Sequence, residues 1–289
     1  MMASTKHSES IQSCVVTKGG RIVSVIVACV LASLCVSHSA MAQMQLTEEN
    51  STVNIVTNSQ AGMNSWTIDG QNVLDQQWFW YRVGNDPTGQ HSLDTLPATY
   101  TSIDAADVGA SFTGATFVVS ATFSLVGSPS GDGTSDMSIQ FKVKNTSGSS
   151  TAFHFYEYSN FVLGGAPGDT VQFLNSNAVS QVGSLGSVYE NTAATGGSGF
   201  AAPMHHEADV VFNTLNKLNS GSPQVLNDST NAGPGDVTWA FEWDLPIAGG
   251  GTSQFSKDIS IVVPEPSTWL LVGMAATLIG LFARRKRTV

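Results

Sequence analysis

Residues 237–245 read VTWAFEWDL, a stretch in which large apolar side chains alternate with small or polar ones. Successive side chains of a β-strand point to opposite faces, so this period of two is typical of a strand with one face in a core. Residues 115–125, ATFVVSATFSL, and residues 139–144, IQFKVK, alternate in the same way. All three stretches therefore predict half-buried strands.

Short runs of Gly, Pro, Ser, Asn and Asp separate the apolar stretches. Residues 128–133, SPSGDG, are expected to close a hairpin between the two strands that flank them. Residues 210–218 fit either a short helix or a strand, and no other helix is expected between residues 43 and 263. Many short strands joined by such turns predict an all-β fold, an antiparallel β-sandwich with jelly-roll-like connections.

The N-terminal segment, residues 1–42, has the layout of a secretory signal peptide. A basic segment precedes an apolar run over residues 22–36, and small side chains follow at Ala40 and Ala42. This order predicts export and cleavage after Ala42, which would leave Gln43 as the new N-terminus.

All three cysteines of the chain, Cys14, Cys29 and Cys35, lie in this N-terminal segment. Residues 26–29 also fit the sequence that precedes a lipid-modified cysteine, but the apolar run continues well past Cys29, which favours the cleavage site at Ala42. The exported domain, residues 43–263, is therefore expected to contain no disulfide, cysteine nucleophile or thiolate metal site.

The C-terminal segment, residues 264–289, contains three features in order. They are Pro264-Glu265-Pro266, an apolar stretch over residues 269–282, and a basic cluster formed by Arg284, Arg285, Lys286 and Arg287. As a helix the apolar stretch would span roughly 21 Å, which predicts a short transmembrane helix. The basic cluster would stay cytoplasmic, which places the domain outside the inner membrane.

This arrangement resembles the PEP-CTERM sorting signal of Gram-negative bacteria, which combines a Pro-Glu-Pro motif, a short membrane helix and an Arg-rich tail. The resemblance implies export through the Sec translocon, an intermediate tethered in the inner membrane, and processing near Pro-Glu-Pro by an exosortase. It also implies a final place in the outer envelope, at the cell surface or in the extracellular matrix, with exopolysaccharide as a candidate partner. An ordinary C-terminal membrane anchor is the alternative.

The segment between the two ends is strongly acidic. Residues 43–263 hold five basic residues against twenty acidic ones, a net charge of about −15. A phosphate backbone would be repelled, so a nucleic-acid partner is not expected. Divalent cations would be attracted, although such a charge also simply keeps an exported domain soluble.

Common enzyme motifs are absent from the sequence, including G-x-S-x-G, H-E-x-x-H, the P-loop and G-x-G-x-x-G. No catalytic residue, metal site or cofactor is therefore predicted. One candidate metal group is His205, His206 and Glu207 with Asp209, because imidazoles and carboxylates bind metal ions. Neighbouring residues of a strand point apart, so an exposed polar loop is the preferred interpretation.

Three further candidates concern sugars and calcium. Glu157 and Glu242 could form the carboxyl pair of a glycosidase if they lie close together, although Glu157 shares a face with phenylalanines. The short loop 132–136 carries Asp132 and Asp136, which could contribute to a calcium site, but a solvated turn is the simpler interpretation. Aromatic rings could stack on sugars or fill the core; these are Trp66, Trp78, Trp80, Tyr81, Trp239 and Trp243.

Taken together, these features predict a non-enzymatic structural or adhesive protein of the envelope or matrix, associated with exopolysaccharide or biofilm. The alternative is a carbohydrate-binding module or a glycoside-active enzyme. Burial of Trp78, Trp239 and Trp243 would favour the structural role, whereas a cleft with two nearby carboxyl groups and exposed aromatic rings would favour the enzyme.

Overall fold

The computed structural model describes residues 43–164, 168–193 and 200–264. The predicted signal peptide, the membrane stretch 269–282 and the basic cluster Arg284–Arg287 lie outside these residues, as do Glu265 and Pro266. In the described ranges, no helix has the length and apolar character needed to cross a membrane.

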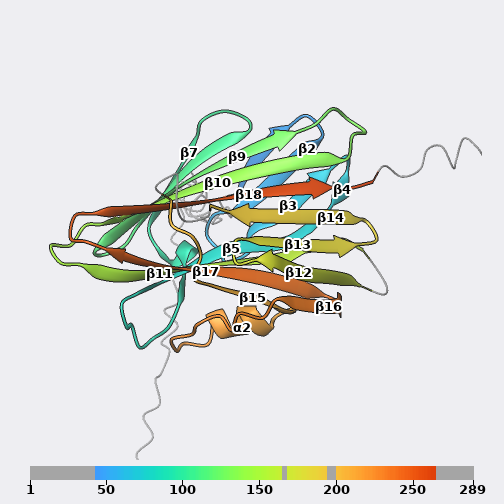
Figure 1. The fold of residues 1–289 in the computed structure, drawn as a ribbon. Coiled ribbons are helices and arrows are strands. Elements are labelled where there is room, and N and C mark those ends of the chain that lie inside the picture. Colours follow the sequence, from blue (N-terminus) through green and yellow to red (C-terminus); the bar gives the residue numbers. More distant parts are fainter. Residues whose placement is uncertain (1–42, 165–167, 194–199, 265–289) are drawn as a thin grey trace, which may run out of the picture. The chain divides into compact units, whose positions relative to one another are not determined.

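The described residues form two β-sheets (Figure 1). The first sheet contains nine strands. Its main path, in spatial order, is β1 (Gln43–Glu48), β2 (Ser51–Val56), β3 (Gly62–Ile68), β5 (Leu74–Val83), β11 (Thr151–Phe161), β17 (Val237–Ile247) and β15 (His205–Val210). Two short strands lie off this path, β4 (Gln71–Asn72) beside β3 and β6 (His91–Ser92) beside β5. The pairs are antiparallel except for a short parallel contact between β3 and β5.

The second sheet also contains nine strands, and its neighbouring strands are antiparallel. Its spatial order is β16 (Asn231–Gly235), β12 (Asp169–Asn175), β13 (Ala178–Gly183), β14 (Gly186–Thr192), β18 (Thr252–Val262), β10 (Thr134–Asn145), β9 (Phe117–Gly127), β8 (Asp107–Thr113) and β7 (Ala98–Ser102). The chain changes sheet at each connection from β14 to β18. The predicted antiparallel β-sandwich is therefore confirmed.

Aromatic rings join the two sheets in one core. The ring centroid of Phe79 on β5 lies 4.7 Å from that of Phe141 on β10. Phe155 on β11 and Trp243 on β17 also pack on Phe255 of β18, with ring centroids 4.8 and 4.7 Å from the centroid of Phe255, respectively. These contacts bury the alternating apolar side chains that predicted the strands.

The central strands of the first sheet differ from the half-buried pattern that their sequence predicts. Every residue of β17 from Val237 to Trp243 is buried, including the outward-facing Thr238, Ala240 and Glu242. Residues 211–230 cover the outer face of β17, and this segment contains the helix α2 (Asn213–Leu218). A 3₁₀ turn, η1 (Leu93–Thr95), follows β6 in another part of the chain. The ambiguous stretch 210–218 is thus mostly helix.

Hydrogen bonds hold this cover against the sheet. The indole Nε1 of Trp80 donates to Asn219 Oδ1 at 3.1 Å, and the backbone N–H of Leu226 donates to Glu242 Oε2 at 3.0 Å. Buried polar groups must find such partners, because an unsatisfied group costs about 1–3 kcal/mol. Both faces of β17 are therefore buried, one by the second sheet and the other by residues 211–230.

Candidate functional site

Polar side chains gather on the outer face of the first sheet, where β5, β11 and β17 run side by side. The register places His154 opposite both Arg82 and Asp244, and Tyr156 opposite Glu242. Residues directly opposite in an antiparallel pair share a face of the sheet. Arg82, His154, Tyr156, Glu242 and Asp244 therefore form one group, the outer-face cluster.

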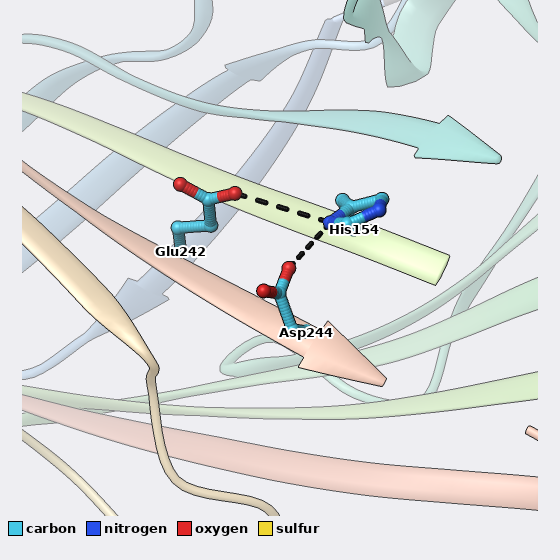
Figure 2. Close-up of side chains that lie close together, drawn as sticks. All are labelled: His154, Glu242 and Asp244. Atoms are coloured by element: carbon cyan, nitrogen blue, oxygen red, sulfur yellow. Dashed lines mark hydrogen bonds and ion pairs between the residues drawn. The ribbon is translucent and has the colours of Figure 1, made fainter. Parts of the chain in front are cut away.

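His154 lies at the centre of this cluster. Figure 2 shows its ring facing the carboxyl groups of both Glu242 and Asp244. Its Nδ1 contacts Asp244 Oδ1 and lies 3.9 Å from Glu242 Oε1. One ligand atom from each residue can be chosen so that all three lie within 4.8 Å of one another. Such an imidazole–carboxylate group has the chemistry to hold a divalent cation.

The two carboxyl groups of the cluster have opposite electrostatic environments. Burial raises the pKa of Glu242, whose Oε1 has no hydrogen-bond partner. The hydrogen bond with His154 instead lowers the pKa of Asp244, whose side chain is 35% exposed. Carboxyl groups separated in this way can act as proton donor and acceptor.

Arg82 and Tyr156 form the buried base of the cluster. The guanidinium Nη1 of Arg82 donates to Gly84 O at 2.7 Å, and Nη2 donates to the Tyr156 hydroxyl at 3.2 Å. That hydroxyl donates in turn to Gln224 O at 3.0 Å. Burial raises the pKa of Tyr156, so it remains a neutral donor.

The sequence-predicted group His205, His206, Glu207 and Asp209 does not converge on one point. The expectation of an exposed loop is wrong, because these residues form the edge strand β15. His205 Nδ1 pairs with Asp228 at 3.1 Å, and His206 Nδ1 lies 3.7 Å from the same carboxyl group while its ring packs on Phe173.

Glu207 serves the fold. Its side chain is fully buried and accepts hydrogen bonds from Thr214 Oγ1 at 2.7 Å and from Lys217. Both partners belong to α2, so Glu207 anchors this helix to β15. Because α2 is part of the segment 211–230 that covers β17, this contact helps to hold that cover in place.

The hypothesis that pairs Glu157 with Glu242 fails on geometry. Glu157 pairs in register with Phe241 and Tyr156 pairs with Glu242, so the two carboxyl groups leave the sheet on opposite faces. Glu157 points into the core, where it contacts Lys257. A glycosidase needs both carboxyl groups on one surface.

The aromatic candidates fill the core. Trp66, Trp78, Trp80, Trp239 and Trp243 have no exposed surface, and Tyr81 stacks on Phe153 with ring centroids 6.1 Å apart. The β5 strand is thus buried on both faces, one of the two arrangements that its sequence allows.

The expected loop 132–136 is only in part a loop, because Asp132 and Gly133 end the β9–β10 turn whereas residues 134–136 begin β10. Asp69, at the end of β3, accepts hydrogen bonds from the backbone N–H groups of Gly131 and Gly133 at 2.8 and 3.0 Å. The Asp136 side chain contacts the Ser260 hydroxyl. Within the described part of the chain, the only cluster with the spacing of metal ligands is His154, Glu242 and Asp244.

Sequence reasoning missed the outer-face cluster. Arg82, His154 and Asp244 each occupy polar positions of recognisable strands, but their convergence depends on the register between strands distant in the chain. No local pattern specifies that register. Glu242 was visible as a polar residue between two tryptophans, yet its burial depends on residues 211–230.

Comparison with solved structures finds distant resemblances of the fold. A putative aldose 1-epimerase from Escherichia coli K12 is 8% identical, with a TM-score of 0.46 over 76% of this chain and 99% of its own. A galactose mutarotase-like protein from Lactobacillus casei ATCC 334 is 10% identical, with a TM-score of 0.49 over 76% and 99%. Similarity at this level carries no inference about activity.

Comparison with curated proteins gives no match. The C-terminal segment does match a known family, since residues 262–287 fit the PEP-CTERM protein-sorting motif. This match confirms the PEP-CTERM sorting motif at the C-terminus and indicates an exported, exosortase-sorted protein with a membrane-anchored sorting signal. The chain is thus a PEP-CTERM sorting domain-containing protein.

Proposed function

We propose that the domain is a non-enzymatic structural or adhesive component of the outer envelope or extracellular matrix, and that its outer-face cluster contacts exopolysaccharide. The observation that carries this proposal is the placement of the aromatic rings and carboxyl groups. The tryptophans of residues 43–264 that could have stacked on sugars are buried, and Glu157 and Glu242 lie on opposite faces of the sheet.

Sugar recognition here would depend on hydrogen bonds. Asp244 is 35% exposed and His205, opposite Glu242 on β15, is 31% exposed, so both offer polar atoms to a ligand. The domain's negative charge disfavours direct binding of an acidic polysaccharide. A divalent cation held by His154, Glu242 and Asp244 would reduce that repulsion at the cluster and could itself bind sugar hydroxyls.

A polysaccharide array probed with the purified protein tests this proposal. Binding to neutral polysaccharides, or cation-dependent binding to acidic ones, is expected. Asp244→Asn should weaken it roughly tenfold or more, because a hydrogen bond to a charged group contributes about 1.5–3 kcal/mol. Asp132→Asn, in the remote β9–β10 turn, is the matched control. No binding to any polysaccharide, or equal binding by the Asp244 variant, would contradict the proposal.

A sugar-active enzyme is the second candidate, favoured by one observation. Glu242 Oε1 has no hydrogen-bond partner and burial raises the pKa of this carboxyl group, which suits a general acid. Incubation of oligosaccharides with the protein, followed by NMR of the anomeric protons, tests it. Turnover that disappears in Glu242→Gln would establish the enzyme and displace the structural proposal.

A further inference from the structure

Three ionisable side chains are sealed between the two sheets. They are Glu157 of β11, Glu190 of β14 and Lys257 of β18, and none has any exposed side-chain surface. Lys257 Nζ contacts Glu157 Oε1 and lies 3.4 Å from Glu190 Oε1. We call these three residues the core triad. They lie apart from the outer-face cluster, on the opposite face of the first sheet.

The core triad is sealed from water by aromatic rings, with two polar side chains, Gln77 and Ser159, beside Glu157. Lys257 Nζ lies 5.5 Å from the centroid of the Phe79 ring. The indole of Trp239 donates from Nε1 to Glu190 Oε2 at 3.2 Å. Separated charges are unfavourable in such surroundings, because the loss of hydration can exceed the attraction of the pair. Transfer of one proton from Lys257 to Glu157 would replace the two charges with an amine and a carboxylic acid, the forms that condense to an amide.

The triad also has one carboxyl group more than it has ammonium groups. Burial and the neighbouring Glu157 carboxyl raise the pKa of Glu190 well above its ordinary value. Glu190 therefore holds its proton to a higher pH than a free glutamate does. It can pass this proton to a neighbouring atom and take another in return.

We propose that Lys257 and Glu157 react to form an intramolecular isopeptide bond, with Glu190 as the proton relay. The Lys257 ammonium first gives a proton to the Glu157 carboxylate. The neutral Nζ then attacks Cδ of Glu157, and a new N–C bond forms. Glu190 takes a proton from the attacking nitrogen and delivers one to the departing hydroxyl. The C–O bond breaks, one water molecule leaves, and Glu190 regains its starting state.

Two donors are placed to assist this step. Gln77 Nε2 and Ser159 Oγ donate to Glu157 Oε1 at 3.0 and 2.9 Å. Lys257 Nζ contacts this same oxygen, so Oε1 takes the proton and becomes the departing hydroxyl, and the two donors fix the carboxyl group in place and stabilise this oxygen as the C–O bond breaks. The reaction needs no oxidant or other co-reactant, since an amine and a carboxylic acid yield an amide and water.

The bond would connect the two sheets through the middle of the core. Residues 157 and 257 are 100 positions apart, so the bond would close a long loop and restrict the unfolded chain strongly. The cysteines of the chain all precede residue 43, which leaves the exported domain without a disulfide to do this. An amide also resists reduction and hydrolysis, which suits a protein outside the cell.

Peptide mapping of the purified full-length protein tests the proposal. Trypsin cuts after free lysine, so an amide at Lys257 would block that cleavage. The expected product is one species that joins residues 145–217 to the peptide that begins at residue 218 and reads through Lys257. Its mass should be lower than the sum of the two peptides by one water. Complete cleavage after Lys257, with the two peptides separate, would overturn the proposal.

Three variants sharpen the test. Lys257→Arg should give separate peptides only. Glu157→Gln should give a linked species of the same mass as the wild type, because an amide side chain loses ammonia where the acid loses water. Glu190→Gln should lower the linked fraction at least tenfold while circular dichroism remains that of the folded wild type. Full linkage in the Glu190 variant would contradict the relay role.

Lys217 supplies an internal control within the same digest. Its Nζ also contacts a buried glutamate, Glu207, but the Lys217 side chain is 23% exposed. Water can hydrate this ammonium group, so no amide is expected and trypsin should cut after Lys217 in every sample. A linked Lys217 would show that contact alone suffices and would remove the special role of the core triad.

Discussion

The two faces of the β11–β17 pair place carboxyl groups in contrasting surroundings. On the inner face, Glu157 and Glu190 meet Lys257 with no access to solvent. On the outer face, Glu242 is equally buried, but its neighbour Asp244 is 35% exposed. Because successive side chains of a strand point to opposite faces, the adjacent residues Tyr156 and Glu157 belong to different groups, Tyr156 to the outer one and Glu157 to the inner one. The inner group can react only with itself, whereas the outer group can exchange ions and ligands with the medium.

Removal of Lys257 should have the largest effect on stability. Lys257→Met removes both the partner of the buried Glu157 carboxyl group and the amide link proposed above, and loss of a buried partner alone costs about 3–5 kcal/mol. Urea denaturation monitored by tryptophan fluorescence measures the loss in the free energy of unfolding. Lys142→Met, on the exposed face of β10, is the control and should change it by less than about 0.5 kcal/mol. Similar values for the two variants would argue against a structural role for the triad.

The next effect concerns the dependence of stability on pH. Burial raises the pKa of Glu190 above its ordinary value of 4.5, so in the window above pH 4.5 the native chain holds a proton that the unfolded chain has lost. Stability therefore falls as pH rises through this window, by up to about 1.4 kcal/mol per pH unit. Glu190→Gln should flatten this slope in denaturation curves recorded from pH 5 to about 8.

A matched control variant shows whether the flatter slope is specific to Glu190 or follows the loss of any carboxyl group. Glu49→Gln, in the exposed turn after β1, should retain the wild-type slope. If the stability of the two variants depends on pH in the same way, Glu190 does not hold the extra proton. Glu190 could then not supply the proton that the proposed amide formation needs.

The smallest effect is expected on the outer face. The hydrogen bond with His154 lowers the pKa of Asp244 from its ordinary value of 3.8, so the pair stabilises the fold above that pH. This stability is lost as pH falls through the lowered native pKa. Solvent screens a side chain this exposed, and Asp244→Asn should cost only about 0.5 kcal/mol near neutral pH. Thermal denaturation near pH 7 and near pH 2 measures the difference in unfolding free energy between the wild type and this variant, which should vanish in acid. A difference above about 2 kcal/mol at pH 7 would show that Asp244 mainly stabilises the fold instead of binding a ligand.

The sequence predicted the strands but not their surroundings. Alternation in residues 115–125 and 139–144 located β9 and β10, because a strand with one apolar face carries its own signal. β17 carries the same signal, yet residues 211–230 cover its other face, and nothing in their composition indicates this contact. The position of Glu157 on an apolar face was a visible anomaly. Its explanation, Lys257, lies 100 residues away on the other sheet and follows only from the packing of the sheets.

The last strand of the sandwich runs almost directly into the sorting signal. β18 ends at Val262, Pro264 opens the motif, and β18 is hydrogen-bonded to β10 along one side and to β14 along the other. Tension on the tail, whether from the membrane or from an attached cell surface, would thus enter the fold at an interior strand. Such a load must shear two rows of hydrogen bonds at once instead of peeling an edge strand away, which gives a tethered domain mechanical resistance at its point of attachment.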